Sequence, residues 1–187
     1  MRAPTNAPVT DRPPRGEGEA PEFPRLFAAH FDYVWHTLRR LGVRQSELED
    51  VTHDVFVAVF RKLDQYDASR PLRPWLFGFA LRVASDYRDL ARFRLEVAEE
   101  PTERRDERPD ALANAMHRQA VSLALQVLNG VPLDRRDVFI LHELDDCPMP
   151  EVAVALGIPL NTAYSRLRLA RADLAAAARR FRSKGEP

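Results

Sequence analysis

The sequence predicts an all-α protein with two small helical domains. Apolar residues recur every three or four positions through most of the chain, which is the spacing of one face of an α-helix. Alternation of apolar and polar residues, typical of β-strands, never extends beyond a few positions. A carboxylate-rich stretch separates the two periodic parts. We therefore expect helical domains at 22–95 and 112–183, joined by an acidic flexible linker at 96–111.

The chain begins with a stretch that cannot form a core. Residues 1–21 contain five prolines, two glycines and almost no large apolar side chain, so we expect a disordered N-terminal tail. No apolar run approaches the ~20 residues needed to cross a bilayer. The single cysteine, Cys147, excludes an internal disulfide. These features predict a soluble cytoplasmic protein with no direct membrane insertion.

Three apolar-periodic segments predict the helices of the N-terminal domain. The first covers 24–41 and stops at Gly42. The second covers 46–63, because Ser46 to Glu49 has the pattern of a capping box. The third starts at Pro74 and runs to about residue 94, as one bent helix or as two helices, given Gly78.

The helix at 46–63 has two unlike faces. Four aliphatic residues at helical spacing form its predicted core stripe: Leu48, Val51, Val55 and Val59. The opposite face presents Asp50, Asp54 and Arg61 around an exposed Val57, with His53 at its flank. An apolar residue with a polar rim is typical of a protein-docking face. The alternative is a solvated face that happens to include one valine.

The helix after Pro74 combines aromatic and basic side chains. Its predicted buried side holds Leu76, Ala80, Val83 and Tyr87, whereas Phe79, Arg82, Ser85 and Arg92 lie on the other side with Trp75 at the edge. Aromatic rings can stack on unpaired bases while guanidinium groups hold phosphates. We therefore consider this face a candidate nucleic-acid contact. The alternative is that the aromatic rings belong to the core.

The C-terminal domain ends in two helices joined by a tight turn. Helices are predicted at 117–130 and 133–146, followed by a short helix at 150–156. Gly157 closes this short helix, and Pro159 precedes a further helix at 160–172. A short helix, a glycine-containing turn of three or four residues and a second helix have helix-turn-helix spacing. The second helix of such a unit enters the major groove of DNA.

The helix at 160–172 is built to bury one face and expose the other. Ala163, Leu167, Ala170 and Leu174 form its apolar face. The residues that share or flank the opposite face are short, amide, aromatic or basic: Asn161, Thr162, Tyr164, Ser165, Arg166, Arg168 and Arg171. From residue 160 onward, seven basic residues face two acidic ones. A solvated charged face is the alternative, but the helix-turn-helix spacing favours DNA contact.

Both parts of the chain resemble one family. The residues at 133–174 resemble region 4 of sigma-70-family transcription initiation factors, through Arg136, Val138, Phe139, Leu141, Glu143, Glu151, Ala153, Leu156, Gly157, Thr162, Ser165, Arg166, Leu167, Ala170 and Arg171. The segments LEDVTHDVFVAVFRKL and RPWLFGFALRVASDYRD are similar to region 2 of the same family. The two-domain layout resembles the extracytoplasmic-function (ECF) group. The sequence departs from the family pattern at Tyr164, Asn161 and His53, where Lys, Gly and Gln are common.

The resemblance implies a role for each candidate set. Core RNA polymerase would be bound through Asp50, His53, Asp54, Val57 and Arg61. The −10 promoter element would be bound through Arg73, Trp75, Phe79, Arg82, Ser85 and Arg92. The −35 element would be read by the arginine-bearing face of the 160–172 helix. It also implies an anti-sigma factor as a further partner, and a linker that follows the polymerase channel.

Two other function classes fit the sequence less well. A stand-alone dimeric helix-turn-helix regulator of operator DNA would leave the N-terminal helices without a role. An enzyme has little support, because the sequence contains no glycine-rich phosphate loop, no metal-ligand spacing and no nucleophile-base pattern. We therefore expect no catalysis, no metal, no cofactor and no small-molecule substrate.

Overall fold

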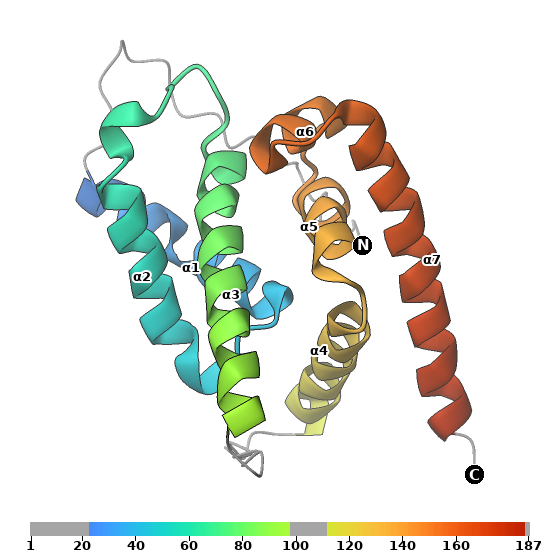
Figure 1. The fold of residues 1–187 in the computed structure, drawn as a ribbon. Coiled ribbons are helices and arrows are strands. Elements are labelled where there is room, and N and C mark those ends of the chain that lie inside the picture. Colours follow the sequence, from blue (N-terminus) through green and yellow to red (C-terminus); the bar gives the residue numbers. More distant parts are fainter. Residues whose placement is uncertain (1–22, 98–111, 186–187) are drawn as a thin grey trace, which may run out of the picture.

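The computed structural model describes residues 23–97 and 112–185, and within these ranges it contains seven α-helices and no strand (Figure 1). The predicted all-α fold is confirmed. The expected disordered tail and nearly all of the expected linker, 96–111, lie outside the described residues. In the described part of the chain, no helix has the length and apolar character that crossing a membrane requires.

The N-terminal unit is a bundle of three helices. These are α1 (Phe23–Leu41), α2 (Leu48–Phe60) and α3 (Leu72–Val97), and each packs against the other two. Their apolar stripes meet in a core whose fully buried members include Val34, Leu38, Val55, Leu76 and Phe77. Two short 3-10 turns, Gln45–Glu47 and Leu63–Gln65, precede and follow α2.

The predicted start of α2 is wrong by two residues. Ser46 lies inside the 3-10 turn Gln45–Glu47, and Glu47 occupies the N-cap position without a side-chain capping hydrogen bond. The capping box suggested by the sequence therefore does not form, because the tighter turn moves Ser46 away from the helix start. The predicted core stripe of α2 is confirmed, since Leu48, Val51, Val55 and Val59 are all buried.

The segment after Pro74 is one continuous helix, so Gly78 does not divide α3. Its buried stripe is shifted from the predicted one. Leu76, Phe77, Ala80 and Ala84 are buried, whereas the expected Val83 and Tyr87 are half-buried. The shift arises because α3 packs against α1, α2 and a helix of the C-terminal unit, so more than one side of it is covered.

The C-terminal unit begins with α4 (Leu112–Asn129) and α5 (Leu133–Phe139), and α5 continues into a π-helical turn, Ile140–Leu144, labelled η3. After a short loop come α6 (Met149–Leu156) and α7 (Leu160–Gly185). α7 packs on α4, α5 and α6. It extends well past the predicted end of this helix at residue 172, because half-buried alanines prolong its packed face.

The two units lie directly against each other. α3 packs on α6, and α1 contacts both α4 and α5. Figure 1 shows α3 standing between α2 on one side and the C-terminal helices on the other. The sequence predicted both units but gave no indication of the contact between them.

Candidate nucleic-acid interface

The turn between α6 and α7 has the geometry of a helix-turn-helix. Gly157 ends α6 in the left-handed region, with φ of +64°, where an L side chain is strained. The N–H of Ile158 donates to the carbonyl of Ala153 at 3.0 Å, which closes the helix end. The predicted closing role of Gly157 is confirmed. Pro159 then precedes α7, and the chain direction changes within three residues.

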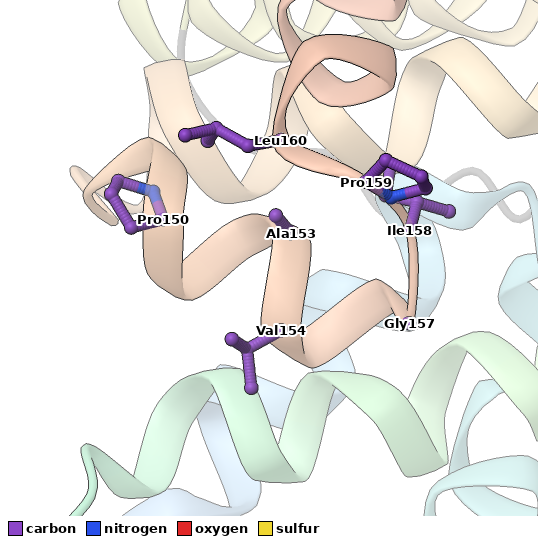
Figure 2. Close-up of a pocket in the computed structure, with 7 residues that line it drawn as sticks. All are labelled: Pro150, Ala153, Val154, Gly157, Ile158, Pro159 and Leu160. Atoms are coloured by element: carbon purple, nitrogen blue, oxygen red, sulfur yellow. The ribbon is translucent and has the colours of Figure 1, made fainter.

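An open apolar hollow lies at this turn, as Figure 2 shows. The residues that line it are Pro150, Ala153, Val154, Gly157, Ile158, Pro159 and Leu160. Val154 and Leu160 are exposed large apolar side chains. The outer surface of α6 is therefore apolar, whereas the outer surface of α7 is polar and basic.

α7 buries and exposes the faces that the sequence predicted. Ala163, Leu167 and Ala170 are buried against the rest of the C-terminal unit. The exposed members of the predicted −35 set are Asn161, Tyr164, Ser165, Arg168 and Arg171, and the half-buried members are Thr162 and Arg166. The structure therefore places the whole set along one side and its margins.

Two arginines tie α7 and the α5–η3 segment together. The Nε of Arg171 donates to Glu143 Oε1 at 3.1 Å, and its Nη2 contacts the same oxygen. Arg135 Nη1 donates to Asp173 Oδ2 at 2.7 Å. Arg171 thus lies at the edge of the exposed face with its charge shared with Glu143, whereas no such pairing is seen at the exposed Arg168 among the described residues.

Beneath this face lies a buried carboxylate. Burial raises the pKa of Asp137 to about 6, against the opposing effects of the backbone N–H of Val138 and the charge of Arg166. The Val138 N–H donates to Asp137 Oδ1 at 2.6 Å. Arg166 therefore has the buried Asp137 as its acidic neighbour, whereas Arg171 has Glu143 at the surface.

The predicted −10 set lies on α3 and the loop before it. The rings of Trp75 and Phe79 are 4.8 Å apart at their centroids, and the ring of Tyr66 lies 4.9 Å from that of Trp75. Both α3 rings are half-buried, so they are neither core residues nor fully free for stacking. Arg73 and Arg82 are exposed and Ser85 is half-buried. The side chain of Arg92 lies outside the described residues.

The predicted docking set on α2 forms one exposed face. Asp50, His53, Asp54 and Arg61 are exposed, and Val57 between them is 48% exposed. His53 Nδ1 lies 2.9 Å from the carbonyl oxygen of Glu49, which orients the ring along the helix. Phe60, which is 61% exposed, extends the same apolar surface. The α2 face therefore combines an apolar centre with charged residues around it.

The sequence identified Arg136 only as a motif residue. In the structure its buried side chain holds two segments of the C-terminal unit together. Its side chain is 1% exposed, and its guanidinium donates to the carbonyls of Asn129 and Val131. It thereby holds the end of α4 and the turn at Gly130. The last carbonyls of a helix need hydrogen-bond donors. An arginine a few residues after an Asn-Gly turn could therefore have been predicted to bind the end of the preceding helix.

In the ranges 23–97 and 112–185, no group of three or more His, Cys, Asp or Glu side chains is placed to hold a metal ion. Cys147 is buried, and burial followed by the charge of Glu151 raises the pKa of its thiol to about 12. A thiol with so high a pKa is unreactive at neutral pH.

Comparisons with known proteins find the same family in both parts of the chain. Residues 26–93 match the family Sigma-70 region 2, and residues 122–174 match the family Sigma-70, region 4. RNA polymerase sigma factor NccH of Alcaligenes xylosoxydans xylosoxydans is 32% identical over 167 residues, covering 86% of this chain and 88% of NccH. ECF RNA polymerase sigma factor SigE of Mycolicibacterium smegmatis is 27% identical over 159 residues, covering 82% of this chain and 60% of SigE.

Two solved structures share the fold. CnrH, in complex with the cytosolic domain of CnrY, is 28% identical and superposes with a TM-score of 0.57, covering 82% of this chain and 85% of CnrH. The sigma factor RpoE of Bartonella quintana, in complex with the anti-sigma factor NepR, is 18% identical with a TM-score of 0.62, covering 84% of this chain and 96% of RpoE. With two family regions matched in order and a relative of nearly full length, this chain belongs to the sigma-70 family of RNA polymerase sigma factors, in the ECF group.

Proposed function

We propose that this chain directs core RNA polymerase to promoters by binding the enzyme through α2, the −10 element through α3 and the −35 element through α7. The observation that carries the proposal is the helix-turn-helix with an exposed Arg168 on the same chain as the α2 face. Separate surfaces for an enzyme and for two DNA elements are what promoter recognition requires. The chain then acts by binding, and polymerase performs the chemistry.

The −35 element would be read as duplex DNA. An α-helix fits the major groove, where arginine can donate two hydrogen bonds to the O6 and N7 of guanine. Arg168 is exposed at the middle of the α7 face and is our candidate for this contact. Arg166 and Arg171, at the margins, would hold phosphates. Tyr164, which is 53% exposed, can pack against a thymine methyl group.

The −10 element would be bound as unpaired bases. The rings of Trp75 and Phe79 form one aromatic surface with Tyr66. Arg82 is exposed, and it lies on the same side of α3 as Gly78, one turn of helix away. Stacking of a base on an aromatic ring contributes about 1–3 kcal/mol. A half-buried ring is held in place by its neighbours and loses little freedom when a base stacks on it.

Regulation would come from a third partner. Because the RpoE structure is a complex with the anti-sigma factor NepR, we infer that an anti-sigma factor also binds this chain. The exposed apolar residues of α2 and α6, among them Phe60 and Val154, offer surfaces for such a partner.

Co-purification tests the proposal against a dimeric operator-binding regulator. The purified chain is mixed with core RNA polymerase without DNA, and the complex is isolated by size exclusion. A sigma factor binds polymerase in this experiment, whereas an operator-binding regulator has no need to. Transcription start sites mapped with the reconstituted enzyme would then reveal both promoter elements. Absence of a complex with core polymerase contradicts the proposal.

The α2 face gives a specific prediction. Replacing both Asp50 and Asp54 with alanine should weaken polymerase binding about tenfold or more, which corresponds to about 1.4 kcal/mol. Both carboxylates are exposed and alanine favours helix, so α2 should stay folded. The measurement is a titration of labelled chain with core polymerase. Asp32→Ala, an exposed carboxylate on α1, is the matched control. If the double variant binds as tightly as the control, the docking surface lies elsewhere.

A further inference from the structure

His53 has a fixed position on the exposed face of α2. Its Nδ1 lies 2.9 Å from the carbonyl oxygen of Glu49, one turn earlier in the same helix. Its ring packs against two aromatic rings of α1, with centroid distances of 6.1 Å to Phe27 and 6.0 Å to Phe31. The residue is nonetheless exposed. The imidazole is therefore held in one orientation and can still be reached by a partner.

The hydrogen bond to Glu49 decides which ring nitrogen carries the proton. A carbonyl oxygen can only accept a hydrogen bond, so Nδ1 of His53 is the donor. In the neutral ring the other nitrogen, Nε2, then has no proton and can only accept. The neutral form of His53 thus presents a hydrogen-bond acceptor to a molecule that binds α2.

The charged groups around His53 on α2 are mostly acceptors as well. Three exposed carboxylates lie within one turn of it: Glu49, Asp50 and Asp54. The exposed Val57 follows one turn later, and Arg61 lies at the end of the same face. An apolar centre with acceptors on one side fits a protein surface that presents N–H donors beside an apolar residue.

The helices packed against α2 add few charges near His53. At about 100° per residue, His30 lies at the edge of the side of α1 that faces α2, whereas Arg25 and Asp32 lie on the far side. Among the described residues, no side chain of α3 has a hydrogen bond, ion pair or ring contact with His53. A change of charge on His53 therefore acts mainly on the α2 face and on the partner bound there.

Protonation reverses the hydrogen-bonding character of this ring. Histidine is the side chain whose charge ordinarily changes between about pH 5 and pH 8. When His53 gains a proton, Nε2 becomes an N–H donor and the ring becomes positive. A partner that presents donors then meets a donor and a like charge in place of an acceptor, so its binding weakens.

We propose that His53 is a specificity-determining residue of the α2 face, which accepts an N–H of core RNA polymerase at Nε2 while Glu49 holds its proton on Nδ1. Protonation of His53 then lowers the affinity for polymerase. This role rests on the proposed function, because it assigns α2 to polymerase. Glutamine, which is common at this position in the family, offers an acceptor oxygen at every pH.

The tautomer is measured first, in the free chain. Nitrogen-15 spectra of imidazole rings distinguish a protonated nitrogen from a bare one, and the spectrum of His53→Gln identifies the signals of His53 among those of the five histidines. We expect the proton on Nδ1 at about pH 8, where a histidine ring is neutral. A proton on Nε2 would overturn the proposal, because that nitrogen would then be a donor.

The affinity for core polymerase is then measured from about pH 8 to about pH 5.5. Polymerase has titratable groups of its own, so the quantity compared at each pH is the Kd of the native chain divided by that of His53→Gln. If binding excludes the proton on Nε2, this ratio should rise about tenfold as the pH falls over this range. His36→Gln, which removes an exposed histidine of α1, is the matched control and should follow the native chain. A ratio that stays constant, or that falls toward acid pH, contradicts the proposal.

A third variant separates the role of the nitrogen from that of the ring. His53→Phe keeps an aromatic ring against Phe27 and Phe31 but has no acceptor. At about pH 8 it should raise the Kd about two- to tenfold, as expected for one lost hydrogen bond, whereas His53→Gln should bind like the native chain. If His53→Phe binds at least as tightly as the native chain, the acceptor is not used and the proposal is wrong. Failure of the proposed function would appear differently, as no binding of the native chain to core polymerase at any pH.

Discussion

Replacing Arg136 with alanine is expected to unfold the C-terminal unit or to lower its stability by about 3–5 kcal/mol. Each carbonyl left buried without a donor costs about 1–3 kcal/mol, and the guanidinium of Arg136 serves two carbonyls, those of Asn129 and Val131, at 2.7–3.2 Å. It also donates to Asn129 Oδ1 at 2.7 Å. The cavity left by so large a buried side chain adds to this loss.

The neighbouring arginine is the matched control. Arg135 pairs with Asp173 at 2.7 Å, but both side chains are about a third exposed, at 32% and 31%. An ion pair so open to water contributes at most about 1 kcal/mol. Arg135→Ala should therefore have a much smaller effect than Arg136→Ala, although the two changes remove the same side chain from adjacent positions.

Two optical signals separate the units in this experiment. Both tryptophans, Trp35 and Trp75, lie in the N-terminal unit, so their fluorescence reports on that unit. Circular dichroism reports on all helices. In urea, Arg136→Ala should lose part of the helical signal at lower denaturant while the fluorescence midpoint moves less. If Arg136→Ala and Arg135→Ala are equally stable, the buried guanidinium does not hold the fold as we infer.

Sequence periodicity predicted most of the helices but not how the units meet. The stripe Leu48, Val51, Val55 and Val59 is visible because burial on a helix repeats every three or four residues. The contact between the units has no such pattern, since Tyr33 of α1 donates to Asp145, which lies 112 positions further along the chain. The aspartate lies in a turn whose sequence indicates only that a turn is present. Pairing of this kind depends on tertiary geometry.

Local signals near helix ends were the least reliable part of the prediction. Ser46 and Glu49 have the residue types of a capping box, yet a 3-10 turn occupies that position. In contrast, the helix end at Gly157 was predicted correctly. A helix that ends in the left-handed conformation usually has glycine at that position, so the signal is specific. The exposed faces of α2 and α7 were predictable from spacing, whereas the pairing of Arg171 with Glu143 was not.

The second prediction concerns the arginines of α7. Arg168→Ala should relax base preference at one or two positions of the −35 element, because a bidentate contact with guanine contributes about 1–3 kcal/mol of discrimination. Arg171→Ala should instead weaken all promoters alike and reduce the salt dependence, as expected for a phosphate contact. Since Glu143 shares the charge of Arg171, that loss should be modest. For the same reason, Glu143→Gln should strengthen binding to all sequences.

In vitro transcription from a library randomised at the −35 element separates these effects. Sequencing the transcripts gives the base preference of each variant, and total yield gives its general affinity. Arg179→Ala, which removes an exposed arginine near the far end of α7, is the control and should match the native chain in both. If Arg168→Ala and Arg171→Ala both lower every promoter equally, α7 is held by the DNA backbone alone. Arg168 would then make no base contact, and sequence preference at the −35 element would have to arise from the shape of the DNA.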